Sequence, residues 1–162
     1  GIQWPCPSED HPGTSTFFTQ KFNTPDGLGH LQVVNYKPPA ELPDAEYPYI
    51  LTTGRSIFHY HTGTMSRRTP KLDAEVPNGF FQINPKDAIK EKIGGGSKVA
   101  LKTRRGTVEA EAHVTEDVPE GLVFLPFHFN ESNANKITNP ALDPACGMPE
   151  YKVCAVKMEV VK

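Results

Sequence analysis

Apolar and polar residues alternate with a period of two along several short stretches, most of them close to glycine, proline or asparagine. This pattern is typical of strands with one face in a core, and β-branched and aromatic residues reinforce it. The predicted strands are Tyr49–Thr53, Gly79–Ile83, Lys98–Arg104, Thr107–Val114, Gly121–Phe127 and Val153–Val161. One further strand is predicted at 31–36, inside a segment that is otherwise rich in loops.

A helix is predicted directly after the second of these strands. Asn84 suits the N-cap, Pro85 the first helical position and Asp87 the third, where a carboxylate reaches back to the cap. Gly94 is the residue expected to end the helix. The apolar stripe is expected to consist of Ala88, Ile89 and Ile93.

The third and fourth strands are expected to form a hairpin around the two-residue turn Arg105-Gly106. Pairing Arg104 with Thr107 places apolar residues of both strands on one face and opposite charges on the other. The expected pairs are Val99 with Ala112, Leu101 with Ala110, Thr103 with Val108, Lys102 with Glu109 and Lys98 with His113.

Many short strands, one clear helix and long connections predict a mainly β structure, mixed or closed. Strands and helices do not alternate in the way that builds a doubly wound sheet. The length of 162 residues suits one domain. Residues 1–48 hold eight of the sixteen prolines and are predicted to be an extended lead-in that wraps a neighbour, with the folded domain at 49–162.

Composition excludes several classes of function. A formal net charge of -2 argues against a nucleic-acid or membrane-surface role for the whole chain, and no apolar run approaches the ~20 residues of a membrane span. Three widely spaced cysteines do not suggest a disulfide framework, so a reducing, cytoplasmic location is expected. The first residue is Gly1 rather than methionine, and the chain reads as part of a longer polypeptide.

The stretch from Tyr49 to Arg55 is the first candidate for binding chemistry. A strand ends in Gly54, which allows close backbone approach, and Arg55 follows with a guanidinium suited to phosphate. Residues 47–72 contain no Asp or Glu but do contain Arg55, Arg67, Arg68 and Lys71. The stretch therefore predicts an anion site, the alternative being that the arginines are solvated and the nearby histidines pack.

His59 and His61 have three possible uses: metal ligation with His128 or a carboxylate as a third ligand, hydrogen bonding to a ligand, or packing. No acidic residue lies nearby in sequence and the arginines would repel a cation, so hydrogen bonding to a ligand is favoured. The run Gly-Gly-Gly-Ser-Lys at 94–98 follows a helix and precedes a strand, the reverse of a phosphate-binding loop, and predicts a turn. No nucleophile motif or carboxylate pair predicts a catalytic residue.

Amide and aromatic side chains are concentrated after the fifth strand. They are Phe127, His128, Phe129, Asn130, Asn133, Asn135 and Asn139. Amides both donate to and accept from a flat polar heterocycle, the alternative being Asx turns that stabilise the loop. Lys152 then lies just before the last strand, where its amine could meet a phosphate or a ring oxygen.

Five sequence blocks, taken together and in order, resemble a known family. They are 51–55 with 59–65 (Leu-Thr-Thr-Gly-Arg and His-Tyr-His-Thr-Gly-Thr-Met), 83–88 (Ile-Asn-Pro-x-Asp-Ala), 104–106 (Arg-Arg-Gly), 126–135 and 149–157. The sequence is similar to the C-terminal region of molybdopterin oxidoreductases, above all to the alpha subunit of formate dehydrogenases. The resemblance covers about residues 4–159.

The resemblance implies a double-psi β-barrel with a few short helices, and a ligand, molybdopterin guanine dinucleotide, that carries molybdenum or tungsten. It assigns Thr53, Gly54, Arg55, Ser56, His59 and His61 to a first cofactor loop, Phe127, His128 and Asn135 to a second, and Tyr151 and Lys152 to a third. No metal ligand is expected in this chain.

The resemblance also implies what lies outside the chain. The catalytic residue and the iron–sulfur cysteines belong to upstream domains of the same subunit, and electron-transfer subunits are the expected partners. The whole subunit would oxidise formate to carbon dioxide, and this part alone would be inactive. The alternatives are the same domain of a nitrate reductase or formylmethanofuran dehydrogenase, or a stand-alone pterin-binding module.

Overall fold

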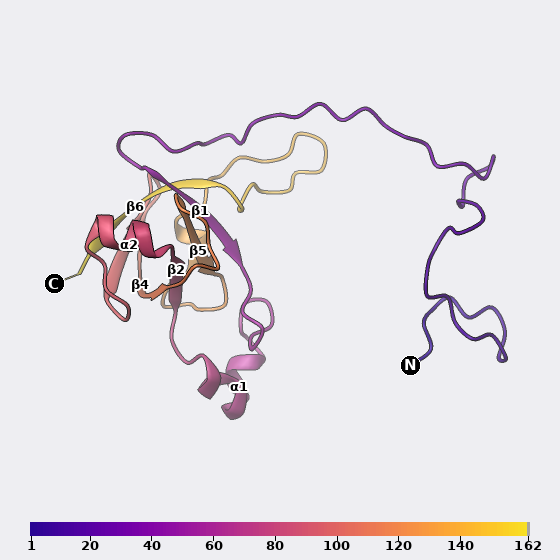
Figure 1. Cartoon of the computed structure of the whole chain (residues 1–162), viewed down its shortest axis with the longest axis horizontal. Helices are drawn as coiled ribbons and strands as arrows, with labels where there is room; N and C mark the ends of the chain where they lie inside the picture. Colours follow the sequence, from indigo (N-terminus) through magenta and orange to yellow (C-terminus); the bar gives the residue numbers. More distant parts are fainter. Residues whose placement is uncertain (162) are drawn as a thin grey trace. The chain divides into compact units, whose positions relative to one another are not determined.

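The computed structural model describes residues 1–161 (Figure 1). It divides the chain into two compact units, Gly1–Lys37 and Pro38–Lys162. Residues 38–48 thus belong to the second unit, although no regular element precedes Tyr49. The division of the chain after residue 48 stays a prediction.

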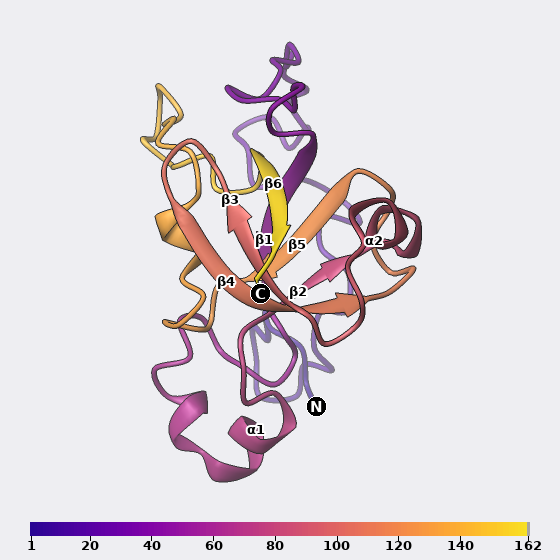
Figure 2. The same ribbon diagram turned by 90° about the vertical axis from the view of Figure 1, so that its left-hand side faces the viewer.

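The second unit is a closed barrel of six strands in the order β1-β5-β2-β4-β3-β6 (Figure 2). The strands are β1 (Tyr49–Gly54), β2 (Phe80–Ile83), β3 (Lys98–Lys102), β4 (Thr107–Val114), β5 (Leu122–Pro126) and β6 (Cys154–Val160). β1 with β5 and β2 with β4 are parallel, and the other four neighbouring pairs are antiparallel. All six strands predicted after residue 48 are present, and the mainly β class is confirmed.

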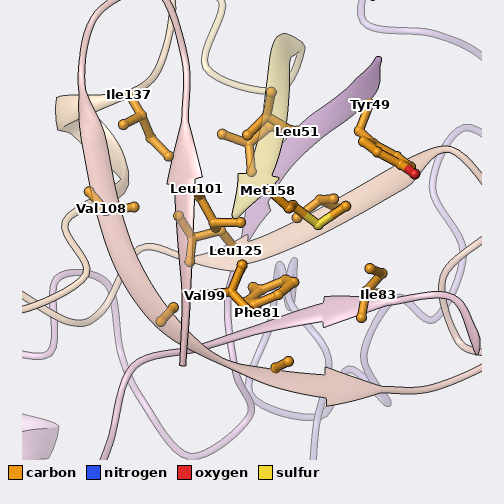
Figure 3. Close-up of a cluster of buried hydrophobic side chains, with 14 of the residues drawn as sticks. Tyr49, Leu51, Phe81, Ile83, Val99, Leu101, Val108, Leu125, Ile137 and Met158 are labelled. Carbon is orange, nitrogen blue, oxygen red and sulfur yellow. The ribbon is translucent and has the colours of Figure 1, made fainter. Parts of the chain in front are cut away.

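Every strand sends apolar side chains into one interior (Figure 3). β1 and β4 alternate buried and more exposed positions through most of their length, as the period of two requires. The labelled interior residues are Tyr49, Leu51, Phe81, Ile83, Val99, Leu101, Val108, Leu125, Ile137 and Met158. Burial of this shared interior, at roughly 25 cal/mol per Å² of apolar surface, is the main force that closes the barrel.

The predicted register of the β3–β4 hairpin is wrong by two residues. Lys102 pairs with Thr107, and the Thr103 N–H donates to the Gly106 carbonyl at 2.9 Å, so Arg104 and Arg105 form the turn. A shift of two residues keeps each side chain on its predicted face, because the period of a strand is two. The face assignment therefore survives, with Val99 opposite Ala110 and Leu101 opposite Val108.

α2 (Pro85–Glu91) begins as predicted but ends earlier. The Asn84 side chain accepts from the Lys86 N–H at 3.0 Å, which makes it the N-cap. The helix ends at Lys92, which adopts the left-handed conformation with φ 57°, instead of at Gly94. Its N–H bonds to helix carbonyls and so satisfies groups that the helix end leaves free.

Two other predictions for α2 are wrong. Asp87 does not reach back to the cap: its carboxylate accepts from the Gly121 N–H at 2.6 Å and so fixes the turn before β5. Ile89 is 79% exposed, whereas Ala88 and Ile93 are buried. A seven-residue helix on a barrel buries a narrow stripe, and Ile89 lies outside it.

Three short helical segments were not predicted: η1 (Ser66–Arg68), α1 (Pro70–Glu75) and η2 (Ala134–Lys136). The strand predicted at 31–36 is absent, since none of these residues has regular secondary structure. None of the helices described in residues 1–161 has the length and apolar character that a membrane span requires.

Candidate functional site

The barrel topology brings three loops to one end. β1 and β5 are parallel and in register, with Gly54 opposite Pro126, so the chain leaves both strands at the same edge. β6 runs antiparallel to β1, with Cys154 opposite Leu51, so the chain enters β6 near that edge. The loops after β1, after β5 and before β6 therefore meet, as ligand-binding loops do at the ends of parallel strands.

Hydrogen bonds join the first loop to the other two. The Ser56 N–H donates to Nε2 of His128 at 2.6 Å, and His128 Nδ1 bonds to the His61 carbonyl. The Thr53 hydroxyl donates to the Tyr151 carbonyl at 2.9 Å. These contacts connect residues 53–61 with 128 and with 151 across sequence separations of 67 to 98 residues.

Lys152 closes the third loop against the first. Its ammonium group donates to the Thr53 carbonyl and lies 5.4 Å from the centre of the Tyr151 ring. The side chain is exposed, so an amine can keep this bond and still meet an anion.

His128 is buried and neutral in this arrangement. Nε2 accepts from Ser56, so the ring proton is on Nδ1, which donates to His61. Burial lowers the pKa of His128, and the charges of Arg55 and the neighbouring histidines act in the same direction, although the bond to His61 opposes them. Protonation would remove the acceptor that holds the Ser56 N–H.

Acidification is therefore expected to destabilise the barrel through His128. The unfolded state takes up this proton near the ordinary histidine pKa of about 6.5, and the folded state takes it up only at a lower pH. The free energy of unfolding contributed by this group is thus present above about pH 6.5 and decreases as the pH falls through the lowered pKa. Urea midpoints of wild type and His128→Gln, measured at about pH 7.5 and about pH 5.5, test this. Between these pH values the urea midpoint of the wild type should fall by more than that of His128→Gln. An equal fall in both proteins would contradict the predicted role of His128.

His59 is held within the protein rather than presented to solvent. Nδ1 lies 3.1 Å from the Ser66 hydroxyl, and Nε2 lies 2.8 Å from the Val76 carbonyl. The ring also makes an edge contact with Phe129 at 5.3 Å. This geometry agrees with the packing alternative; a direct contact of His59 with a cofactor stays a prediction.

Position 54 requires a glycine because the Phe124 ring leaves no space for a side chain there. A Cβ at this position would lie 2.3 Å from Cε2 and 2.8 Å from Cζ of the Phe124 ring. Gly95 in the α2–β3 turn is a contrast, because a Cβ there would meet nothing within 4 Å.

Gly54→Ala is expected to destabilise the barrel by about 1–3 kcal/mol, because the methyl group overpacks against Phe124. Urea unfolding measures the loss, with Gly95→Ala as the control that should stay close to wild type. The double variant Gly54→Ala/Phe124→Ala should cost less than the sum of the two single changes. Additive costs would show that the two residues do not clash.

Arg55 is the exposed cation of the first loop. Its Nη2 lies 3.4 Å from the His61 ring nitrogens, and its guanidinium lies 6.0 Å from the centre of the Phe127 ring. Within residues 1–161 it forms no ion pair. His61 beside it is also exposed. The guanidinium is thus free to bind an anion.

Three other arginines are already paired with carboxylates. Arg67, which the sequence placed in the same positive stretch, contacts Asp73 at 3.2 Å and Glu131 at 2.8 Å. Arg104 and Arg105 of the hairpin turn pair with Glu41, and Arg104 also pairs with Asp44. Arg68 and Lys71 are exposed but lie outside the loops that hydrogen bonds join, so Arg55 is the residue of the positive stretch that we assign to the predicted anion site.

Glu41 is the site-supporting residue that sequence reasoning missed. Besides both arginines it accepts from the Ala155 N–H at 2.8 Å, so it fixes the start of β6 to the β3–β4 turn. Burial acts to raise its pKa, but hydrogen bonds from Arg105 and Ala155 hold it below the usual range. The Pro-rich surroundings of Glu41 gave no signal in the sequence, because its partners lie more than 60 residues away.

The amide-rich loop serves mainly to fix its own path. Asn133 accepts from the Asn135 N–H at 3.0 Å, and Asn139 donates to the Val153 carbonyl at 2.6 Å while its N–H bonds to the Cys154 sulfur. These two amides follow the loop-stabilising alternative. Asn135 is exposed in η2, and no hydrogen bond within residues 1–161 joins it to the first or third loop.

No group of three or more His, Cys, Asp or Glu side chains in the described part of the chain is placed to hold a metal ion. The site is thus a set of three connected loops with a free guanidinium, an amine and aromatic faces. Such a set suits a flat anion more than a bare cation.

A model of the Molydopterin dinucleotide binding domain family matches residues 49–155, from the start of β1 into β6. The chain belongs to this family. Membership in this family supports a molybdopterin cofactor, in agreement with the prediction from the sequence.

Curated relatives of this molydopterin dinucleotide binding domain match it over nearly its whole length. The F420-dependent formate dehydrogenase subunit alpha of Methanocaldococcus jannaschii is 54% identical over 98% of the chain, and the F420-dependent formate dehydrogenase 1 subunit alpha of Methanococcus maripaludis is 50% identical over 99%. The assimilatory nitrate reductase catalytic subunit of Bacillus subtilis is 40% identical over 98%. The chain spans about a quarter of these relatives, 24%, 24% and 23% of their lengths.

Among solved structures, acetylene hydratase from Pelobacter acetylenicus matches 72% of the chain and 19% of its own, with a TM-score of 0.64 and 20% identity. This likeness concerns the fold. With the closed six-strand order it confirms the predicted double-psi β-barrel with a few short helices.

Proposed function

We propose that this chain is the C-terminal cofactor-binding domain of a formate dehydrogenase alpha subunit and that it binds molybdopterin guanine dinucleotide. The observation that carries the proposal is the joining of three loops at the end of β1, where Arg55 is exposed without a carboxylate partner among residues 1–161. The sequence identity of about 50% to two archaeal formate dehydrogenase alpha subunits supports formate as the substrate.

The residues at the barrel end fit a flat, phosphorylated pterin. Arg55 would take a phosphate, because its guanidinium makes paired, charge-assisted hydrogen bonds. Ile57 and Tyr60 of the same loop are 92% and 58% exposed and offer apolar surface to a ring. The groups with free hydrogen-bonding capacity that would complete the contacts are Ser56 Oγ, His61, Asn135 and Lys152.

Other predicted residues would act by positioning these groups. The Thr53 hydroxyl, the His128 ring nitrogens and the Tyr151 carbonyl form hydrogen bonds between the loops, and Gly54 leaves room for the Phe124 ring. Such pre-formed contacts reduce the conformational entropy that binding would otherwise cost.

The bound cofactor, with molybdenum or tungsten, would supply the two-electron chemistry that converts formate to carbon dioxide. This chain's own part is to bind and orient it and to exclude water from one side. Upstream domains would hold the catalytic residue and an iron–sulfur cluster, with electron-transfer subunits as partners, in the cytoplasm.

Purification of the full-length subunit and of the 162-residue chain tests the proposal. The subunit should contain the pterin dinucleotide and oxidise formate, whereas the chain alone should be inactive. Formate oxidation by the chain alone, or a subunit without pterin, would overturn it. Nitrate reduction without formate oxidation would favour the nitrate reductase alternative, which the relative from Bacillus subtilis supports.

A further inference from the structure

Residues 31–36 (Leu-Gln-Val-Val-Asn-Tyr) carry large apolar side chains in full contact with solvent. Leu31 is 98% exposed, Val33 91%, Val34 87% and Tyr36 84%. In an extended chain Leu31 and Val33 point to one face and Val34 and Tyr36 to the other, so both faces are apolar. Exposure of this extent in consecutive residues marks an interaction surface or an aggregation hazard.

The surrounding unit does not provide a core for these residues. No residue of 1–37 is buried. The exposed large apolar residues of this unit also include Ile2, Trp4, Phe17, Phe18, Phe22 and Leu28. A segment of fewer than about 40 residues rarely builds a core alone, and a solvated linker would be poor in aromatic and β-branched residues. The burial of these side chains must therefore come from other protein surface.

The main chain of residues 31–36 is free as well. Within residues 1–161 its N–H and C=O groups form no hydrogen bond, and the segment has no regular structure. Val, Tyr and Leu favour extended structure when a neighbouring strand supplies the bonds. Apolar side chains on both faces together with free main-chain groups describe a strand without its neighbour.

The neighbouring strand is identified by excluding the barrel and a second copy of the chain, and by the greater length of the relatives. The barrel is closed, so strands β1 to β6 offer no open edge for another strand. Pairing with the same segment of a second copy gives a two-stranded ribbon, which is marginal in water. The curated relatives are about four times longer than this chain, since it covers 24% of their length. We propose that residues 31–36 form a β-strand on an open sheet edge in the part of the catalytic subunit that this chain does not contain.

This inference rests on the proposed function in one respect, namely that the chain is a domain of a longer subunit. Hydrogen exchange with single-amide resolution tests it. In the full-length subunit, amides of alternate residues in 31–36 should exchange at least about 100-fold more slowly than in the 162-residue chain, because a strand on an edge donates every second N–H. Equal exchange in the two proteins would overturn it. So would protection in the 162-residue chain, either constant with concentration (a contact with the barrel) or rising with it (a second copy).

Val33→Asp separates docking from folding, with Thr16→Asp as the control that adds the same charge at an exposed position of the same unit. In the full-length subunit Val33→Asp should abolish the slow exchange of 31–36 and Thr16→Asp should preserve it. In the 162-residue chain neither change should move the melting of the barrel. Retained slow exchange in Val33→Asp would contradict the proposal. Pterin content and formate oxidation, measured on the same subunit, report on the proposed function separately.

Discussion

Leu101→Asp is expected to abolish the cooperative unfolding transition of the barrel. Leu101 is 0% exposed in β3, between Val108 of β4 and Met158 of β6. An unpaired carboxylate there costs more than about 4 kcal/mol, a large share of the roughly 5–15 kcal/mol that stabilises a domain. Circular dichroism during heating measures the result.

Ile89→Asp is the matched control, because it also replaces an aliphatic residue with a carboxylate. Ile89 is 79% exposed, so the change in the free energy of unfolding should stay within about 0.5 kcal/mol. A wild-type melt for Leu101→Asp would refute the placement of β3 in the core. A large loss for Ile89→Asp would instead support the apolar stripe predicted from the sequence.

Arg55→Ala is expected to remove most of the pterin dinucleotide from the full-length subunit while the barrel stays folded. Each hydrogen bond to a charged group contributes about 1.5–3 kcal/mol, so retention should fall by roughly 10- to 150-fold. The folded state should be little affected, because the exposed guanidinium forms no ion pair within residues 1–161. Pterin and metal content per polypeptide after gel filtration measures the loss.

Arg68→Ala is the control for this experiment. Arg68 is exposed in η1 and belongs to the same positive stretch, but it lies outside the loops joined at the barrel end. Its replacement should leave pterin content unchanged. Full pterin content in Arg55→Ala would show that Arg55 does not bind the anion, and equal losses in both variants would indicate a general effect of charge.

The strands and their faces were predictable because alternation depends on nearest neighbours along the chain. The hairpin register was not, since a shift of two residues leaves every side chain on the same face. The structure places the turn at Arg104 and Arg105, whose side chains reach Glu41, about 60 residues away. A tertiary ion pair thus accompanies a turn that local sequence preference had placed one residue later.

The meeting of the three loops was predictable, whereas the hydrogen-bond and ion-pair partners of individual residues were not. Residue types indicated which loops carry donors, and the family resemblance indicated that they meet. Which donors remain free depends on distant partners: His59 uses Ser66 and Val76, and Arg67 uses Asp73 and Glu131. Only Arg55 of the predicted charged residues in the first stretch combines exposure with a place at the joined loops.

Cys154 gives the barrel end a built-in reporter. Its thiol is fully buried at the start of β6, and burial raises its pKa, while Cys6 and Cys146 are exposed. Alkylating reagents will therefore modify two thiols at once and reach the third only when the structure around the start of β6 opens. The rate at which Cys154 is alkylated therefore reports how often the barrel opens beneath the third loop. Mass spectrometry measures this rate without any substitution.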